Sequence, residues 1–347
     1  MTTKIGMMRM TKMETTTITV AEDEVAPVIM TKTITEPAPD AGLSLPQILL
    51  VVGPTASGKT ALALALASHT NGIIISADSR QCYREMAIGS AAPTAEEMQG
   101  IPHRLVADRS VHEHLSAGQF EREALQCLAE GMATGQQIIV CGGAGLFLKA
   151  LVHGLDDLGN EDPQIRTYWQ QRYRTEGLAA LQQEILSRDP DYAAQADMNN
   201  HQRLLRALEI MDSRGQRLSE LRTQSAKDRP FRCCWIGINP ERAWLHEAIN
   251  TRVDQMVSQG LEKEAAALYP WDTVKACQSP GYVEWEGYWN GSIDHATCVE
   301  HIKQHTRQFA RRQLTWFRRN PNIHWIPSEI TQNPSRLEWV LRNFPIR

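Results

Sequence analysis

Residues 53–60 read Gly-Pro-Thr-Ala-Ser-Gly-Lys-Thr, and this stretch decides the fold that the rest of the chain is expected to adopt. It lies between an apolar run at residues 48–52 and an Ala- and Leu-rich segment at residues 61–67. An apolar run bounded by Pro46 and Gly53 predicts a buried parallel strand, and alanine and leucine are strong helix formers. A GxxxxGK[ST] pattern between a strand and a helix predicts a phosphate-binding loop, and with it a P-loop NTPase-like α/β fold in which helices flank a parallel sheet.

All eight residues of this loop are predicted to contribute to a site for a diphosphate or a nucleotide. Glycines let backbone N–H groups converge on an anion, and the N-terminus of the following helix adds partial positive charge. The ammonium group of Lys59 supplies a full charge, and the hydroxyl group of Thr60 can reach a Mg²⁺ ion. The predicted anion-binding residues are Gly53, Pro54, Thr55, Ala56, Ser57, Gly58, Lys59 and Thr60. The alternative is a chance glycine turn before an ordinary helix.

Length and composition limit the class of protein. A chain of 347 residues with 42% apolar content can bury a large core, and such a length suggests about two domains. No apolar run approaches the roughly 20 residues that span a bilayer, and the N-terminus lacks the pattern of a secretory signal, so we expect a soluble protein without membrane contact. The seven cysteines form no CxxC pair, which favours reduced thiols in a cytoplasmic protein and no zinc site.

Three regions are expected along the chain. Residues 1–43 are rich in Thr and Met and show no sustained period, which predicts a disordered N-terminal extension. Residues 156–229 change to long polar helices rich in arginine, which predicts a helical insertion domain. Residues 44–155 and 230–347 then make up the P-loop α/β core together with basic C-terminal helices.

Short apolar runs and amphipathic segments predict the remaining elements of the core. We expect strands at residues 73–76, 137–141, 233–238 and 324–326, with the last at an edge of the sheet. We expect helices at residues 116–133, 241–259, 261–268 and 294–319. The region 84–118 contains a glycine and prolines, which predicts a loop.

Asp78 is the candidate catalytic residue, because it directly follows the predicted strand at residues 73–76. The carboxyl ends of parallel strands share a crevice, so Asp78 is expected to face the phosphate loop. An aspartate in this position is also typical of a helix N-cap, and the two roles are compatible.

Glycines occupy residues 142, 143 and 145, at the end of the strand predicted for residues 137–141. A hydrolytic P-loop NTPase places an acidic residue there, so the sequence indicates a reaction other than nucleotide hydrolysis. Glycines at a strand end permit a bulky ligand to approach the backbone closely.

A basic segment near the C-terminus contrasts with the net charge of −4. Its cations are Lys303, Arg307, Arg311, Arg312, Arg318 and Arg319, with no Asp or Glu between them. A charge run alone is usually a solvated helix face. Because Phe309, Trp316 and Phe317 lie among these cations, a nucleic-acid-binding surface is favoured.

A series of short motifs spans most of the chain. They are GPTASGKT at residues 53–60, DSRQCY at 78–83, PHR at 102–104, a glycine-rich segment at 142–151, QRLLRALE at 202–209, GY at 281–282 and TRQFARRQLTWFR at 306–318. Together they resemble the tRNA dimethylallyltransferase family over residues 46–327, in the family's order and spacing. The last motif is far more specific than the phosphate loop, which many nucleotide enzymes share.

The resemblance implies transfer of a dimethylallyl group from dimethylallyl diphosphate to the exocyclic 6-amino group of the adenosine that follows the anticodon in tRNA, with Mg²⁺ as cofactor. It implies that Asp78 accepts the proton of the amine, that Lys59 and Thr55 contact the leaving diphosphate, and that Thr60 lies near the metal ion. An allylic diphosphate ionises readily, so stabilising the departing anion lowers the barrier. The adenine must be flipped out of the anticodon stem-loop to reach the diphosphate.

The resemblance also implies contacts with tRNA. The implied residues are Asp78, Ser79, Arg80, Gln81, Ala144, Arg166, Gln202, Arg203, Leu204, Leu205, Arg206, Arg307, Arg311 and Arg312. Those of the last motif would bind backbone phosphate, which positions the RNA without reading its sequence.

Several positions depart from the family's pattern, among them Ser279-Pro280 before Gly281, which is unusual. The family usually has Thr at Ala144, Lys at Ala92, Arg at Ala248 and Asp at Asn200. One polar contact with tRNA should therefore be missing at position 144, and two cations are absent near the presumed diphosphate or RNA surface.

Three other functions remain open at this point. An adenylate dimethylallyltransferase would use free AMP or ADP, and the arginine-rich insertion argues against it. A P-loop kinase for a small metabolite would have no use for a helical insertion of this size. A catalytically silent RNA-binding protein could keep the fold without the reaction. For the favoured function we expect a monomer whose partners are dimethylallyl diphosphate and the tRNA anticodon stem-loop.

Overall fold

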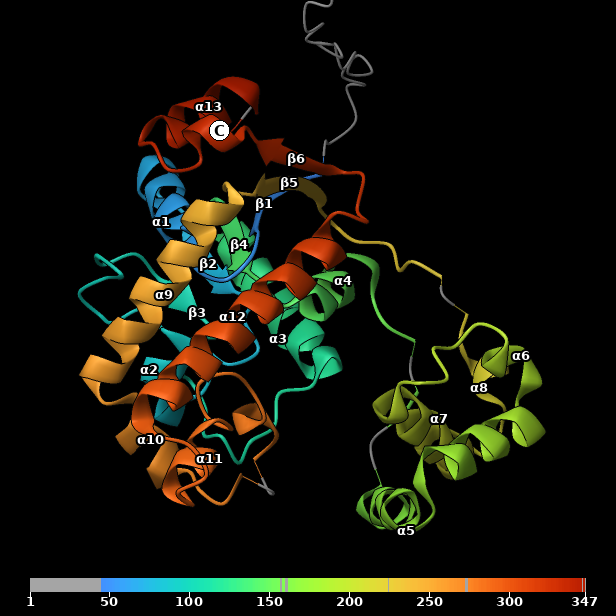
Figure 1. Ribbon diagram of the computed structural model, residues 1–347. Helices are drawn as coiled ribbons and strands as arrows, with labels where there is room; N and C mark the ends of the chain where they lie inside the picture. The colour runs from blue at the N-terminus through green and yellow to red at the C-terminus, as the bar shows by residue number, and fades with distance from the viewer. Residues whose placement is uncertain are drawn as a thin grey trace, which may run out of the picture. The chain divides into compact units, whose positions relative to one another are not determined.

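The phosphate loop joins the strand and the helix that were predicted around it. In the computed structural model, β1 (Gln47–Val52) ends where the loop begins, and α1 (Lys59–Thr70) begins at its lysine (Figure 1). The structure describes residues 45–156, 158–159, 162–223, 225–271, 274–344 and 346. The predicted extension at residues 1–43 lies outside them.

Strands of the described residues form one parallel sheet in the order β3-β2-β4-β1-β5-β6. The strands other than β1 are β2 (Ile73–Ser76), β3 (His103–Arg104), β4 (Ile138–Gly142), β5 (Arg232–Ile238) and β6 (Ile323–Ile326). All five neighbouring pairs run parallel, so the carboxyl ends of β2, β4, β1 and β5 lie along the same edge. The predicted fold class is confirmed, and β6 is the edge strand that was predicted at residues 324–326.

The buried strand β1 sends alternate side chains into two hydrophobic clusters. Ile48, Leu50 and Val52 belong to one cluster, which also contains residues of α3 (Ala117–Ala133), α4 (Gly145–His153), α9 (Arg242–Gln259) and α12 (His295–Phe317). Leu49 and Val51 belong to the other, with residues of α1 and α13 (Ser335–Asn343). The continuous apolar run of β1 is therefore explained by helices on both faces of the sheet.

The remaining helices are short, apart from α5 and α7. They are α2 (Ala87–Ser90), α5 (Pro163–Arg188), α6 (Pro190–Ala193), α7 (His201–Arg214), α8 (Leu218–Leu221), α10 (Leu261–Ala267) and α11 (Trp285–Trp289), with 3₁₀ turns at Arg84–Met86, Lys275–Cys277 and Ser328–Ile330. No helix in the described part of the chain has the length and apolar character that crossing a membrane requires.

Helices α5 to α8, which carry yellow-green colours in Figure 1, have a hydrophobic cluster of their own. It contains Trp169, Leu181 and Ile185 of α5 together with the apolar face of α7. Residues 45–347 group into one unit by their contacts, so the predicted boundaries of the helical insertion at residues 156 and 229 stay predictions.

Several elements of the core were missed in the sequence. The region predicted as a loop, residues 84–118, contains the short helix α2 and the two-residue strand β3. Helices α4, α11 and α13 were not predicted either, and α13 follows β6 near the C-terminus. Strand β3 is too short to show a period of two, and its pairing with β2 comes from the fold. Val340 of the short helix α13 and Phe344 directly after it are buried in the cluster that contains residues of α1 and of the sheet. The charged residues of α13 obscure this apolar face in the sequence.

Candidate functional site

The phosphate loop is held in shape by its own hydrogen bonds. The Ser57 hydroxyl, which is buried, donates to the Pro54 carbonyl oxygen at 2.8 Å. The Lys59 ammonium group donates to the same oxygen at 2.5 Å. Gly53 and Gly58 have φ angles of 154° and 83°, which a residue with a side chain rarely adopts. The loop therefore has the curved backbone that a phosphate-binding turn requires.

Lys59 is the cation of this loop. Burial lowers its pKa to about 8, while the negative charge of Asp78 opposes that shift and the positive charge of Arg252 adds to it. Among the described residues, its hydrogen bond goes to a neutral carbonyl group rather than to a carboxylate. An anion in the loop would supply the opposite charge that the ammonium group lacks.

Asp78 lies at the carboxyl end of β2, as predicted, and is partly buried. Its Oδ1 atom accepts a hydrogen bond from the Arg80 backbone N–H group at 3.0 Å. Burial lowers the pKa of Lys59, Arg80 and Arg252, and the negative charge of Asp78 opposes that shift in each, so all three cations lie within its electrostatic range. The structure thus brings together Asp78 and Lys59, which the sequence placed in one crevice.

Arg252 is the residue of this group that sequence reasoning missed. It lies on α9, its Nη2 atom donates to the Ser90 carbonyl oxygen at 3.4 Å, and burial lowers its pKa. The signal was present, because Arg252 is one residue before the buried Val253 and three after the buried Ile249, so it occupies the inward face of the helix. A cation on an inward face needs an anionic partner, and Asp78 is near.

Gln313 connects the basic helix to the phosphate loop. Its side chain is buried, and its Oε1 atom accepts from the Thr55 N–H group at 2.8 Å while its Nε2 atom donates to the Gly143 carbonyl oxygen at 3.1 Å. This residue was not among the predicted site residues. It fixes Thr55 and the turn after β4 in one arrangement.

The glycines at the end of β4 allow the backbone to approach other protein atoms closely. A Cβ atom on Gly143 would lie 2.2 Å from the Gln313 Nε2 atom, and one on Gly142 would lie 2.1 Å from the Ala77 carbonyl oxygen. These glycines therefore have a role in packing within the protein, and the close approach of a bulky ligand stays a prediction. Ala144, at the start of α4, donates its N–H group to the same Ala77 oxygen at 3.1 Å.

The two polar neighbours of Asp78 differ in their surroundings. Ser79 is exposed. Gln81 accepts from the Ser76 hydroxyl at 3.0 Å and donates to the Ala91 carbonyl oxygen at 3.1 Å, so its amide group holds the local turn. The Arg80 guanidinium lies over the Phe309 ring, 4.9 Å from the ring centroid, and burial lowers its pKa.

The basic segment lies on α12. Arg311 and Arg312 are exposed, and the Arg312 guanidinium is 5.8 Å from the Phe309 ring centroid, on the same ring that Arg80 contacts. Arg307 is partly buried and donates to the Asn250 Oδ1 atom at 2.6 Å. The segment therefore presents charge outward from Arg311 and Arg312, while Arg307 also holds α12 to α9.

The predicted tRNA-binding residues of α5 and α7 fall into three groups. Gln202 and Arg203 are exposed. Leu204 and Leu205 are 0% and 4% exposed and pack inside the cluster of α5 to α8, so a direct side-chain contact with RNA is corrected to a structural role. Arg166 and Arg206 both pair with the buried Glu209, at 3.7 Å and 3.3 Å.

Thr60, the predicted metal-binding residue, is exposed in the first turn of α1. No group of three or more His, Cys, Asp or Glu side chains in the described residues could hold a metal ion. Mg²⁺ is typically coordinated by one or two protein oxygens together with substrate phosphate and water. A single threonine beside a phosphate loop is compatible with that coordination.

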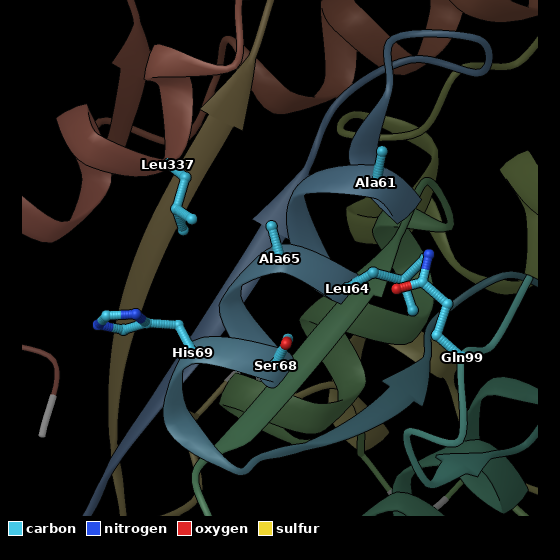
Figure 2. Close-up of a pocket in the computed structure, with 7 residues that line it drawn as sticks. All are labelled: Ala61, Leu64, Ala65, Ser68, His69, Gln99 and Leu337. Carbon is cyan, nitrogen blue, oxygen red and sulfur yellow. The ribbon is translucent and has the colours of Figure 1, made fainter.

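A surface pocket of about 440 Å³ lies beside α1 (Figure 2). Its lining residues are Ala61, Leu64, Ala65, Ser68, His69, Gln99 and Leu337. None of them belongs to the phosphate loop or to the group around Asp78. The pocket is therefore separate from the candidate active site. Figure 2 shows that Leu337 of α13 faces α1 across it.

Comparisons with known proteins agree on one family. The IPP transferase family model matches residues 81–320. The tRNA dimethylallyltransferase of Cytophaga hutchinsonii is 40% identical over 296 residues, which cover 85% of this chain and 97% of that protein. The full-length tRNA isopentenylpyrophosphate transferase of Bacillus halodurans is 34% identical, with a TM-score of 0.61 and coverage of 86% and 96%. A eukaryotic dimethylallyltransferase acting on tRNA, 24% identical, has a TM-score of 0.71 with coverage of 86% and 79%, which shows the shared fold.

Proposed function

The chain belongs to the IPP transferase family, and from this premise we propose that it transfers a dimethylallyl group from dimethylallyl diphosphate to tRNA. The acceptor is the exocyclic 6-amino group of the adenosine that follows the anticodon, and the products are N6-isopentenyladenosine and diphosphate. The observation that carries this proposal is the position of Asp78. It has Lys59 of the phosphate loop within electrostatic range, and one of its carboxylate oxygens is engaged by the Arg80 N–H group.

On the donor side, the phosphate loop would bind the diphosphate. During transfer, the bond between the allylic carbon and the diphosphate oxygen breaks, and its electron pair goes to that oxygen. The backbone N–H groups of the loop and the Lys59 ammonium group would stabilise the negative charge that develops there. Because Gln313 fixes the loop at Thr55, these donors are in place before the substrate arrives.

On the acceptor side, Asp78 would act as the general base. The amine nitrogen forms a bond to the allylic carbon and loses a proton, which the Asp78 carboxylate accepts. The second oxygen, Oδ2, makes no hydrogen bond within the described residues, so it is available to the amine. General base catalysis of this kind contributes roughly 10²–10⁴-fold to a rate.

Magnesium fits this arrangement, and Thr60 is the residue that would contact it. The ion, when bound, neutralises part of the charge of the diphosphate. The chain's own contribution at this point is to hold the diphosphate against the start of α1, where the hydroxyl group of Thr60 is exposed.

The tRNA would contact the exposed cations of α12. Arg311 and Arg312 are free to approach backbone phosphates, and Phe309, between Arg80 and Arg312, extends this basic surface towards Asp78. The exposed Gln202 and Arg203 on α7 would add contacts from the helical insertion.

A transfer assay with two acceptors and a reaction without acceptor tests the proposal. The purified full-length chain is incubated with labelled dimethylallyl diphosphate and either unmodified tRNA, AMP or no acceptor. Label in tRNA is the expected result, with a tRNA whose target adenosine is replaced by guanosine as the control. Label in AMP would assign the chain to free-nucleotide chemistry. Tight tRNA binding without transfer to any acceptor would make it an RNA-binding protein that lacks the reaction.

A further inference from the structure

An arginine of the C-terminal helix lies against the phosphate loop. Arg336 is the second residue of α13, and its Nη1 atom is 2.7 Å from the position that a Cβ atom on Gly58 would occupy. Gly58 is the residue directly before Lys59, where the loop turns into α1. The guanidinium group therefore adjoins the part of the loop in which backbone N–H groups and the ammonium group meet an anion.

Arg336 has little else to neutralise it. Its Nη1 atom donates to the Thr331 carbonyl oxygen at 3.3 Å, and no ion pair within the described residues includes it. It is partly buried, and burial lowers its pKa. By contrast, Arg342 on the same helix is exposed and pairs with Glu338. A partly desolvated cation with no carboxylate partner is suited to receive an anionic ligand.

The helix that carries Arg336 is anchored, so its position is well defined. Val340 and Phe344 are buried in the cluster that also contains residues of α1. Leu337, which directly follows Arg336, lines the pocket beside α1 together with Ala61 and Ala65 (Figure 2). The residues that follow Arg336 hold α13 against α1, and the Arg336 guanidinium group reaches Gly58 at the start of that helix.

We infer that Arg336 binds the diphosphate of the donor, as a second cation beside Lys59. The inference rests on the proposed function, which supplies the diphosphate. It adds a residue outside the segment that the family model matches, residues 81–320, and it gives α13 a role in substrate binding. The competing explanation is structural: Arg336 only tethers the turn before α13 by its bond to Thr331.

The test measures the binding of inorganic pyrophosphate to the full chain by calorimetry, which requires no catalysis. The variants are Arg336→Gln and Arg336→Lys, and the matched control is Arg342→Gln on the exposed side of the same helix. A charge-assisted contact predicts that Arg336→Gln weakens binding by roughly tenfold or more. Arg336→Lys should restore most of the affinity because it keeps the charge, while Arg342→Gln should leave it unchanged. Thermal unfolding of each variant is recorded in parallel.

Two outcomes would overturn the inference. Unchanged pyrophosphate affinity in Arg336→Gln would exclude a direct contact. An equal loss in the Gln and Lys variants, together with an equal fall in melting temperature, would show that the residue only tethers α13. Both outcomes leave the wild-type chain binding pyrophosphate and modifying tRNA, so the proposed function stands. Failure of the wild-type chain to bind pyrophosphate would remove the inference together with its premise.

Discussion

The two groups of cations in this protein differ in their surroundings. Lys59, Arg80 and Arg252 gather around Asp78, and burial lowers the pKa of each of them. Arg311 and Arg312 on α12 are exposed to solvent. Charges of the first kind act at short range in a medium that screens them weakly, whereas charges of the second kind act at longer range and are screened by salt. The first group is suited to one small, highly charged ligand, and the second to an extended polyanion.

Removing the carboxylate at the centre of the first group should have the largest effect. Asp78→Ala is expected to lower the rate of transfer by roughly 10²–10⁴-fold, because the amine loses its proton acceptor. Affinity for tRNA, measured by filter binding, should stay within a few-fold, because the exposed arginines are intact. The control is Asp191→Asn, an exposed carboxylate on α6. A variant at position 78 that keeps the wild-type rate would remove Asp78 from the base role.

Removing a buried cation should weaken the binding of the diphosphate donor without changing the binding of tRNA. Arg252→Gln is expected to weaken pyrophosphate binding and raise the KM for dimethylallyl diphosphate by about 10- to 100-fold, since a charge-assisted contact is lost in a desolvated site. Affinity for tRNA should not change. Arg242→Gln, at the exposed start of the same helix, is the control. If tRNA affinity fell instead, the division between the two groups of cations would be wrong.

The lowered pKa of Lys59 predicts opposite pH dependences for binding and for stability. Lys59 loses its proton as the pH rises through about 8, so pyrophosphate affinity should fall above that pH, by up to about tenfold per pH unit. In the unfolded chain the pKa of Lys59 returns to 10.5, so between about pH 8 and pH 10.5 the unfolded state binds more protons than the folded state. The contribution of Lys59 to the free energy of unfolding therefore rises with pH over this range.

Isothermal titration between pH 7 and 10 checks the first trend, and urea unfolding of the ligand-free protein checks the second. Lys59→Arg keeps its charge throughout and should show neither trend over that range. An affinity that does not depend on pH in the wild-type chain would mean that Lys59 is not the cation that meets the anion.

The exposed group should respond to salt. Replacing both Arg311 and Arg312 by Gln is expected to weaken tRNA binding for every sequence, and to reduce the slope of log affinity against log salt by about 1.5, because fewer counterions are released. Arg232→Gln, at the amino end of β5, is the control. Pyrophosphate affinity should be unaffected. An unchanged slope would show that α12 does not face the RNA.

Residues of the site that lie close together in the chain were more readable in the sequence than residues that only the fold brings to it, for a physical reason. A strand, a glycine loop and a helix are local, so residues 53–60 and the position of Asp78 could be predicted from neighbouring residues. Arg252, Gln313 and Arg336 come from three distant helices and reach the loop only through the fold. Their contacts are non-local; helical periodicity marks Arg252 as facing inward, but no local pattern indicates which groups the three residues contact.

The residues of α7 illustrate a different limit. A motif places Leu204 and Leu205 beside exposed polar residues, but helical periodicity turns the leucines inward, where they are buried. The hydrophobic period of α7 indicates that these leucines face inward. Membership of the motif had implied that they contact tRNA. For the glycines after β4, the sequence predicted a close approach of the backbone, while the fold determined that its partners are Ala77 and Gln313.

The smallest predicted effect is at Ala144, between β4 and α4. Ala144 begins α4 beside the turn that Gln313 holds, is partly buried and has no side-chain cap. Ala144→Thr adds a hydroxyl group at this position, and one net hydrogen bond of about 1 kcal/mol predicts a gain of about fivefold in affinity for the anticodon stem-loop. Ala144→Val, which has nearly the same shape without the hydroxyl group, separates hydrogen bonding from added bulk. Because Ala144 donates its N–H group to the carbonyl oxygen of Ala77, the residue before Asp78, a gain in Thr but not in Val would mean that the RNA reaches the edge of the buried group. Equal affinities in all three proteins would confine the RNA to the exposed arginines of α12 and the insertion.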